Sequence, residues 1–150
     1  MKVLIAVDAS ETAEKAFDWY FAHMHKDDNF VIIGHIAEQP QMYQPYFGGV
    51  MAPFPVNEVE ELIKKSKKEV RELMLKYEAK IHKDTVKHQF VFDIVHCAPG
   101  EALIHLAEKD ECDIIITGSR GLGAVRRTIL GSVSDYVLHH AKIPVLVCHK

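Results

Sequence analysis

The sequence has few of the features that mark secreted, membrane or metal-dependent proteins. Its three cysteines, Cys97, Cys112 and Cys148, form no metal-binding pattern and cannot all pair in disulfides. We therefore expect buried free thiols in a reducing compartment. No apolar run approaches the length of a membrane span, and the run after Met1 is too short for a signal peptide. These absences predict a cytoplasmic protein without a membrane segment.

The chain also lacks the surplus of lysine and arginine that a general nucleic-acid-binding protein carries, because its formal net charge is -3. Its ten histidines include no HExxH or similar ligand frame, so we expect no metal site. Hydrophobic residues make up 48% and charged residues 26% of the chain, which is ordinary for a globular protein. A chain of this length fits one domain, residues 1–150, with one hydrophobic core.

Short apolar runs rich in β-branched residues alternate with segments of helical periodicity along the chain. The longest predicted helix covers Asn57 to Lys83, and Asn57 with Glu60 resembles a capping box. Strand–helix alternation indicates an α/β fold, an open five-stranded parallel sheet with helices on both faces. The predicted strands are Lys2 to Val7, Phe30 to Ile36, Thr85 to Val95, Asp113 to Thr117 and Ile143 to Cys148.

The segment Glu38 to Val56 interrupts this alternation. It holds four prolines, two adjacent glycines and several aromatic residues, so it cannot form a regular helix or a central strand. A loop of this length is often functional, although a surface insertion is an equally good interpretation. Four lysines in the following helix are expected to form a solvated face: Lys64, Lys65, Lys67 and Lys68.

A glycine-rich stretch follows the fourth predicted strand. It opens with Gly118-Ser119-Arg120-Gly121, and after nine further residues it closes with Gly131-Ser132-Val133-Ser134, which begins a helix. Glycines let backbone amides approach an anion, and the amides of a helix start favour a phosphate. We therefore predict phosphate contacts at both ends, with hydroxyl donors from Ser132 and Ser134 and a cation from Arg120.

This stretch differs from other phosphate-binding loops. The chain has no GxxxxGK[ST] motif, and the dinucleotide-binding fingerprint is incomplete and follows the wrong strand. Asp8 ends the first strand, and it would face the same crevice if the first and fourth strands are neighbours. A carboxylate there suits a ribose hydroxyl or an adenine edge, whereas a simple turn residue is the alternative.

Along nearly its whole length the sequence resembles the universal stress protein family. The resemblance includes the opening run Val3 to Ser10, the segment Cys112 to Gly121, and the G-x2-G-x9-G-[ST] pattern, which marks the ATP-binding branch of that family. It implies a Rossmann-like sheet in the order 3-2-1-4-5. It also implies that Asp8 and Ala9 meet the ribose and adenine end and that Ile36 contacts adenine through its backbone. The implied phosphate contacts are Gly118, Arg120, Gly121, Gly131, Ser132, Val133 and Ser134.

The resemblance further implies a regulatory protein of the stress response that binds ATP, with ADP, AMP and ATP-bound Mg²⁺ as possibilities. The chain supplies no obvious general base, so we expect little or no hydrolysis. A protein-interaction module with a vestigial site, and a slow ATPase or nucleotidyl transferase, are the alternatives. We expect a homodimer through the last strand, Pro144 to Cys148, because an apolar edge strand invites pairing. One departure is Cys97-Ala98-Pro99, where many family members have Gly-Asp-Pro.

Overall fold

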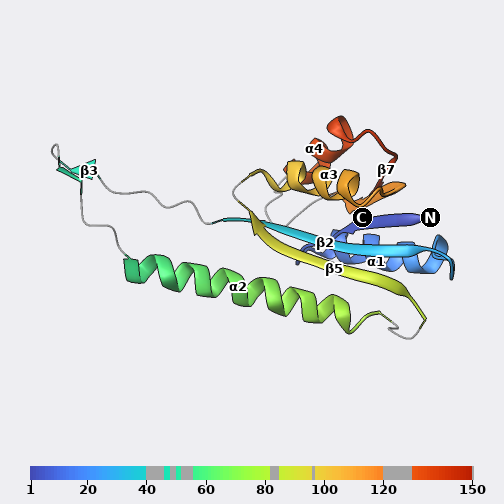
Figure 1. The fold of residues 1–150 in the computed structure, drawn as a ribbon, viewed down its shortest axis with the longest axis horizontal. Coiled ribbons are helices and arrows are strands. Elements are labelled where there is room, and N and C mark those ends of the chain that lie inside the picture. Colours follow the sequence, from blue (N-terminus) through green and yellow to red (C-terminus); the bar gives the residue numbers. More distant parts are fainter. Residues whose placement is uncertain are drawn as a thin grey trace.

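The structure is a computed structural model of the 150-residue chain. Its described part contains a five-stranded parallel sheet with helices packed on both faces (Figure 1). A separate antiparallel pair joins β3 (Tyr46–Phe47) and β4 (Val50–Met51). The residues that the structure describes are 1–39, 46–47, 50–51, 56–81, 85–95, 97–119 and 130–149.

The large sheet runs in the order β5-β2-β1-β6-β7, and its four neighbouring pairs are all parallel. Counted along the chain, this is the order 3-2-1-4-5, so the predicted fold and strand order are confirmed. The order reverses at β1, because β2 and β5 lie on one side of it and β6 and β7 on the other. The five strands are β1 (Lys2–Ala6), β2 (Phe30–Glu38), β5 (Lys87–Val95), β6 (Ile114–Gly118) and β7 (Val145–Cys148).

The central strands are apolar because both faces of the sheet are covered. Val3, Leu4 and Ile5 of β1 are fully buried. Successive side chains of a strand point to opposite faces. Val3 and Ile5 therefore join one apolar cluster with Phe17, whereas Leu4 joins a second cluster with Leu103. The short central strands thus contribute to two cores at once.

Two helices cover each face of the sheet. The helix after β1 begins at Ser10, whose hydroxyl accepts a hydrogen bond from the Ala13 amide, as expected of an N-cap residue. The third helix begins with Pro99 in its first turn, where its missing amide costs nothing. One face carries α1 (Glu11–His23) and α2 (Val56–Glu78), and the other carries α3 (Pro99–Lys109) and α4 (Ser132–His140) (Figure 1).

The predicted bounds of the longest helix are wrong at both ends. α2 begins at Val56, so Asn57 lies within its first turn and is not the N-cap residue of a capping box. α2 ends at Glu78, although helix-compatible residues continue to Lys83. The reason is a tight turn in which the Ile81 amide donates to the Glu78 carbonyl, and this turn places the Ile81 side chain in the core.

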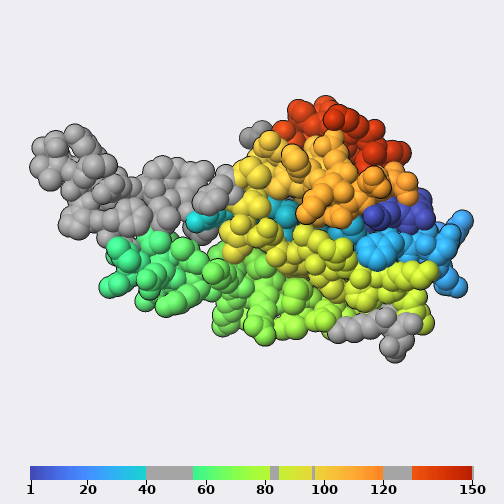
Figure 2. Space-filling view, viewed as in Figure 1, coloured from blue at the N-terminus to red at the C-terminus, as the bar shows by residue number. Residues whose placement is uncertain are grey.

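Most of α2 is a solvated helix. Only Leu73 and Tyr77 among its described side chains are buried. Its N-terminal turns extend beyond the strands of the large sheet (Figure 1), and in the space-filling view they form the green projection at the left (Figure 2). The lysines in its middle are exposed, and several pair with glutamates four residues away, as for Lys64 with Glu60. The predicted solvated lysine face is therefore present.

The three cysteines are free thiols of unequal burial. Cys112 is buried and Cys148 is half-buried, but Cys97 is exposed, so the prediction of buried thiols is wrong there. Cys97 lies in the connection between β5 and α3, where its side chain has no sheet face to pack against. None of the helices in the described part of the chain is both long and apolar enough to cross a membrane.

Candidate functional site

A cleft of about 270 Å³ opens at the carboxyl ends of the central strands. It lies where the strand order reverses, which is the place at which open parallel sheets bind ligands. Its lining comes from the ends of β1, β2 and β6 and from the first turns of α1, α3 and α4. The fold therefore brings six elements of the chain to one cleft.

The cleft brings together most of the residues predicted from the sequence. Ala9 is exposed beside it and is not part of the lining. Arg120 and Gly121 lie outside the described residues. The predicted residues that line the cleft are Asp8, Ile36, Gly118, Gly131, Ser132, Val133 and Ser134.

Asp8 is fixed in the turn between β1 and α1. Its Oδ1 accepts a hydrogen bond from the Ser10 amide at 2.8 Å and another from the Ser10 hydroxyl. This is the pattern of an Asx turn. The turn interpretation of Asp8 is therefore confirmed, and the same half-buried residue also lines the cleft. Oδ2 makes no hydrogen bond with the described residues, so it is available to a hydroxyl of a ligand.

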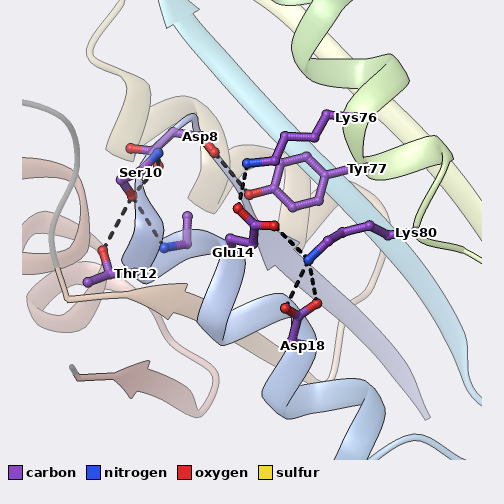
Figure 3. A network of polar contacts seen from close by, with 9 residues as sticks. Asp8, Ser10, Thr12, Glu14, Asp18, Lys76, Tyr77 and Lys80 are labelled. Atoms are coloured by element: carbon purple, nitrogen blue, oxygen red, sulfur yellow. Dashed lines mark hydrogen bonds and ion pairs between the residues drawn. The ribbon is translucent and has the colours of Figure 1, made fainter.

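A second contact holds the backbone of Asp8. The hydroxyl of Tyr77, on α2, donates a hydrogen bond of 2.9 Å to the Asp8 carbonyl (Figure 3). Burial, aided by the negative charge of Asp8, raises the pKa of Tyr77 well above its usual range. The phenol therefore keeps its proton and remains a donor at any physiological pH.

The start of α4 provides amide donors toward the cleft. Gly131 is the N-cap residue, and it has no side chain to cover the helix end. The Gly131 amide itself donates to the Ser119 carbonyl at 2.8 Å. The next amides, from Ser132 to Ser134, lack intrahelical acceptors, as the first amides of any helix do. Together with the positive end of the helix dipole, they favour an anion.

The Ser134 hydroxyl is used inside the protein. It is buried, and it lies 3.0 Å from the Gly131 carbonyl and 3.3 Å from the Ser119 carbonyl. Its single proton is therefore donated to main-chain carbonyls. These contacts join the start of α4 to the residue that follows β6. Ser132 is exposed, and its hydroxyl makes no hydrogen bond with the described residues. Of the two predicted hydroxyl donors, only that of Ser132 is therefore not committed to the main chain of the described residues.

Gly118 lines the cleft, and close packing against α1 also requires glycine at this position. A Cβ at this position would lie 2.6 Å from the Thr12 carbonyl carbon and 2.6 Å from the Ala13 nitrogen. Both atoms are backbone atoms of the first turn of α1. Only glycine lets α1 come this close to β6, and the approach brings the start of α1 to the cleft.

His35 is a lining residue that the sequence analysis did not single out. Its Nδ1 lies 2.8 Å from the Val7 carbonyl oxygen, and because a carbonyl only accepts, Nδ1 carries the proton. Burial lowers the pKa of His35, so the neutral ring is favoured and Nε2 is an acceptor. Its place beside Ile36, at the end of the second strand, is the signal that could have found it.

The walls of the cleft are mainly aliphatic. The only charged side chain among its described lining residues is Asp8. No group of three metal-ligating side chains was found among the described residues. The arrangement suits a flat apolar group between aliphatic walls, with polar atoms near Asp8 and near the amides of α4. The apolar lining consists of Ala6, Val7, Ala13, Ile36, Pro99, Leu103 and Val133.

The fold and the cleft together define a Rossmann-like α/β protein with a cleft at the reversal of its strand order. Comparison with known families assigns it further, because the profile of the universal stress protein family matches residues 1–149. The chain belongs to the universal stress protein family. The resemblance seen in the sequence is thereby confirmed at the level of the family.

Several curated relatives match nearly the whole chain. Universal stress protein MJ0577 from Methanocaldococcus jannaschii is 30% identical over 155 residues, which cover 97% of this chain and 93% of that protein. Universal stress protein Sll1388 from Synechocystis is 25% identical over 150 residues, which cover 97% of this chain and 96% of that protein.

Solved structures show the same fold. The structure of MJ0577 matches with a TM-score of 0.78 and 27% identity, covering 99% of this chain and 95% of that one. A family member from Arabidopsis thaliana, solved with AMP bound, matches with a TM-score of 0.65 and 21% identity over 100% of this chain and 92% of that one. A universal stress protein in complex with cAMP gives a TM-score of 0.57 and 22% identity, with coverages of 99% and 96%.

Proposed function

We propose that this protein binds an adenine nucleotide, with ATP as the expected ligand, and acts as a regulatory protein with little or no hydrolysis. The carrying observation is the convergence of Asp8, Ile36 and the start of α4 on one cleft. AMP and cAMP in structures of two family members support adenine as the base. ADP, AMP and ATP with Mg²⁺ are the forms to be compared.

The described residues fit the three parts of such a ligand. The aliphatic walls beside Ile36 suit the base, because burial of a flat apolar ring is favourable there. Oδ2 of Asp8 suits a ribose hydroxyl, and the amides that begin α4 suit a phosphate. Arg120 and Gly121 complete the predicted phosphate contacts. Several weak contacts must act together, since each helix-dipole contact is worth about 0.3–1 kcal/mol.

The absence of efficient hydrolysis is part of the proposal. Phosphoryl transfer needs a positioned water, a base and usually a metal clamp. Among the described lining residues the titratable side chains are Asp8 and His35. We take Asp8 to meet the ribose, and His35 directly precedes Ile36, the expected adenine contact, so neither is expected beside the terminal phosphate. A measured turnover above the uncatalysed rate, lost on mutation of either residue, would favour the slow ATPase instead.

The direct test is to identify the nucleotide that copurifies with the protein by mass, and then to titrate nucleotide-free protein by calorimetry. Asp8→Asn keeps the Oδ1 acceptor of the turn but removes the charge, so Kd should rise about tenfold. Asp113→Asn is the matched control. Asp113 is an exposed aspartate that accepts a hydrogen bond from the Lys2 amide at the amino ends of β1 and β6, whereas the cleft lies at the carboxyl ends of the strands. Equal affinity of both variants and the wild type would overturn the site.

A homodimer through β7 is the second part of the proposal. Within the described sheet β7 pairs with β6 on one side and forms the edge on the other. Unpaired edges of apolar strands associate, and a two-fold axis would pair β7 with its own copy. Val145→Lys should shift sedimentation toward the monomer, whereas Gln89→Lys on the opposite edge strand should not. A wild type that sediments as a monomer at tens of micromolar would contradict it.

One observation favours the alternative of a protein-interaction module. The N-terminal half of α2 exposes Val56 and Leu62, with exposed fractions of 55% and 48%. Contiguous exposed apolar patches mark partner-binding surfaces, and a partner that covers this half of α2 would bury both side chains. Nucleotide-free protein with no measurable affinity for any adenine nucleotide would make this module the better interpretation.

A further inference from the structure

No residue of helix α2 lines the cleft, but the Tyr77 hydroxyl of α2 bonds Asp8, which does line it. The Tyr77 hydroxyl donates to the backbone carbonyl of Asp8 at 2.9 Å, although the two residues lie far apart in the sequence. We propose that Tyr77 is a positioning residue for the nucleotide site, which sets the turn that carries the Asp8 carboxylate. This inference rests on the proposed function, because Asp8 is taken there as a ligand contact.

Tyr77 is suited to such a role because it is itself immobilised. Its side chain is fully buried, and its ring packs against Phe17 of α1 with centroids 5.1 Å apart. The residue belongs to the apolar cluster beneath the sheet. A buried ring in a close-packed core has one position, so its hydroxyl presents a fixed point to the Asp8 carbonyl.

Ion pairs between α1 and α2 hold this part of the helix in register. Lys76 pairs with Glu14 at 2.5 Å, and Lys80 pairs with Glu14 and with Asp18 at 2.8 Å each (Figure 3). Hydrogen bonds from the two lysines lower the pKa of Glu14, which therefore stays ionised. Each partly exposed pair contributes little alone, but the three share members and flank Tyr77 on both sides.

Asp8 is consequently held from two directions. Ser10 holds the carboxylate through Oδ1, and Tyr77 holds the carbonyl of the same residue. The first contact lies within the turn, whereas the second ties the turn to α2. Without the Tyr77 hydroxyl the peptide after Asp8 gains freedom to rotate, and Oδ2 loses its set position toward the cleft. Affinity should then fall although every residue that lines the cleft is unchanged.

The experiment compares Tyr77→Phe with Tyr20→Phe in nucleotide-free protein, using calorimetry for the Kd of AMP and ATP and urea unfolding for stability. Tyr20 is the matched control, because it is a fully buried tyrosine of the same core. Its hydroxyl bonds Asn29 and His25, at 3.1 Å each, outside the cleft lining. Both variants lose one buried hydroxyl and should lose comparable stability.

We expect Tyr77→Phe to raise the Kd by about threefold to tenfold, the effect of one lost hydrogen bond, and Tyr20→Phe to leave it unchanged. In the background of Asp8→Ala, Tyr77→Phe should have no further effect, because the positioned carboxylate is gone. Wild-type affinity in Tyr77→Phe, or an equal loss in Tyr20→Phe, would overturn the inference. A wild type that binds no adenine nucleotide would instead overturn the proposed function and this inference with it.

Discussion

Gly118→Ala should be much more costly than an ordinary exchange of glycine for alanine. The added Cβ would lie 2.6 Å from two backbone atoms, the Thr12 carbonyl carbon and the Ala13 nitrogen. Favourable carbon contacts begin at about 3.5 Å, so the first turn of α1 would have to move by roughly 1 Å. Ala13 is buried, so this movement would disturb the core. We expect a loss of about 3 kcal/mol in the free energy of unfolding, the upper end of what overpacking costs.

The matched control is Gly34→Ala, in the neighbouring strand β2. There the nearest atom to the added Cβ is Leu4 Cδ1 at 2.9 Å, which is the end of a side chain and not backbone. We expect a loss of about 1 kcal/mol or less, because Leu4 can adjust. Both variants remove the same backbone freedom from the unfolded chain, so that effect cancels in the comparison.

Urea unfolding of the two variants and the wild type gives the difference directly, and the Tm of Gly118→Ala should be about 6–12 °C below that of the wild type. The movement of α1 also carries Ser10 and Asp8, so nucleotide affinity should fall in Gly118→Ala alone. Indistinguishable stabilities for the two variants would refute the reasoning, since they would show that α1 yields without cost.

Further measurements test individual side chains. Burial lowers the pKa of His35 from its ordinary value near 6.5, so the unfolded chain binds a proton first as the pH falls. Wild-type stability should therefore decline on acidification below about pH 6.5, and His35→Asn, which can still donate to the Val7 carbonyl, should decline less in urea unfolding. Burial raises the pKa of Cys112 to about 11, so iodoacetamide should label the exposed Cys97 long before Cys112, as read by peptide mass. Equal labelling rates in the native protein would contradict this burial. Saturating ATP should raise the Tm of nucleotide-free protein by about 5–10 °C, and GTP should raise it less. Equal shifts with ATP, GTP and inorganic triphosphate would indicate an unselective anion site.

The sequence predicted the features that depend on short stretches of chain. Apolar runs located the strands of the sheet, because this signal is local. Asp8 and the start of α4 were predicted because each ends or begins an element at the same edge of the sheet. The structure brings both to one cleft.

The features that were missed or wrong depend on contacts between distant segments. The Ser134 hydroxyl lies near the Gly131 carbonyl of its own turn and also near the distant Ser119 carbonyl, and the need for glycine at 118 arises from the approach of α1. The contacts with Ser119 and with α1 have no local signal. The early end of α2 follows from the burial of Ile81, which periodicity alone did not distinguish from a continuing helix.

The pairing of Gly131 with Ser119 has a consequence for how the protein can change. The Gly131 amide and the Ser119 carbonyl meet at 2.8 Å, and the Ser119 amide is bound in turn to the Cys148 carbonyl of β7. The two ends of the segment 120–130 are therefore fastened to the sheet by the main chain. Doubling the length of a closed loop costs only about 0.6 kcal/mol. Insertions, deletions or a grafted segment between these two residues should therefore leave the stability of the domain almost unchanged.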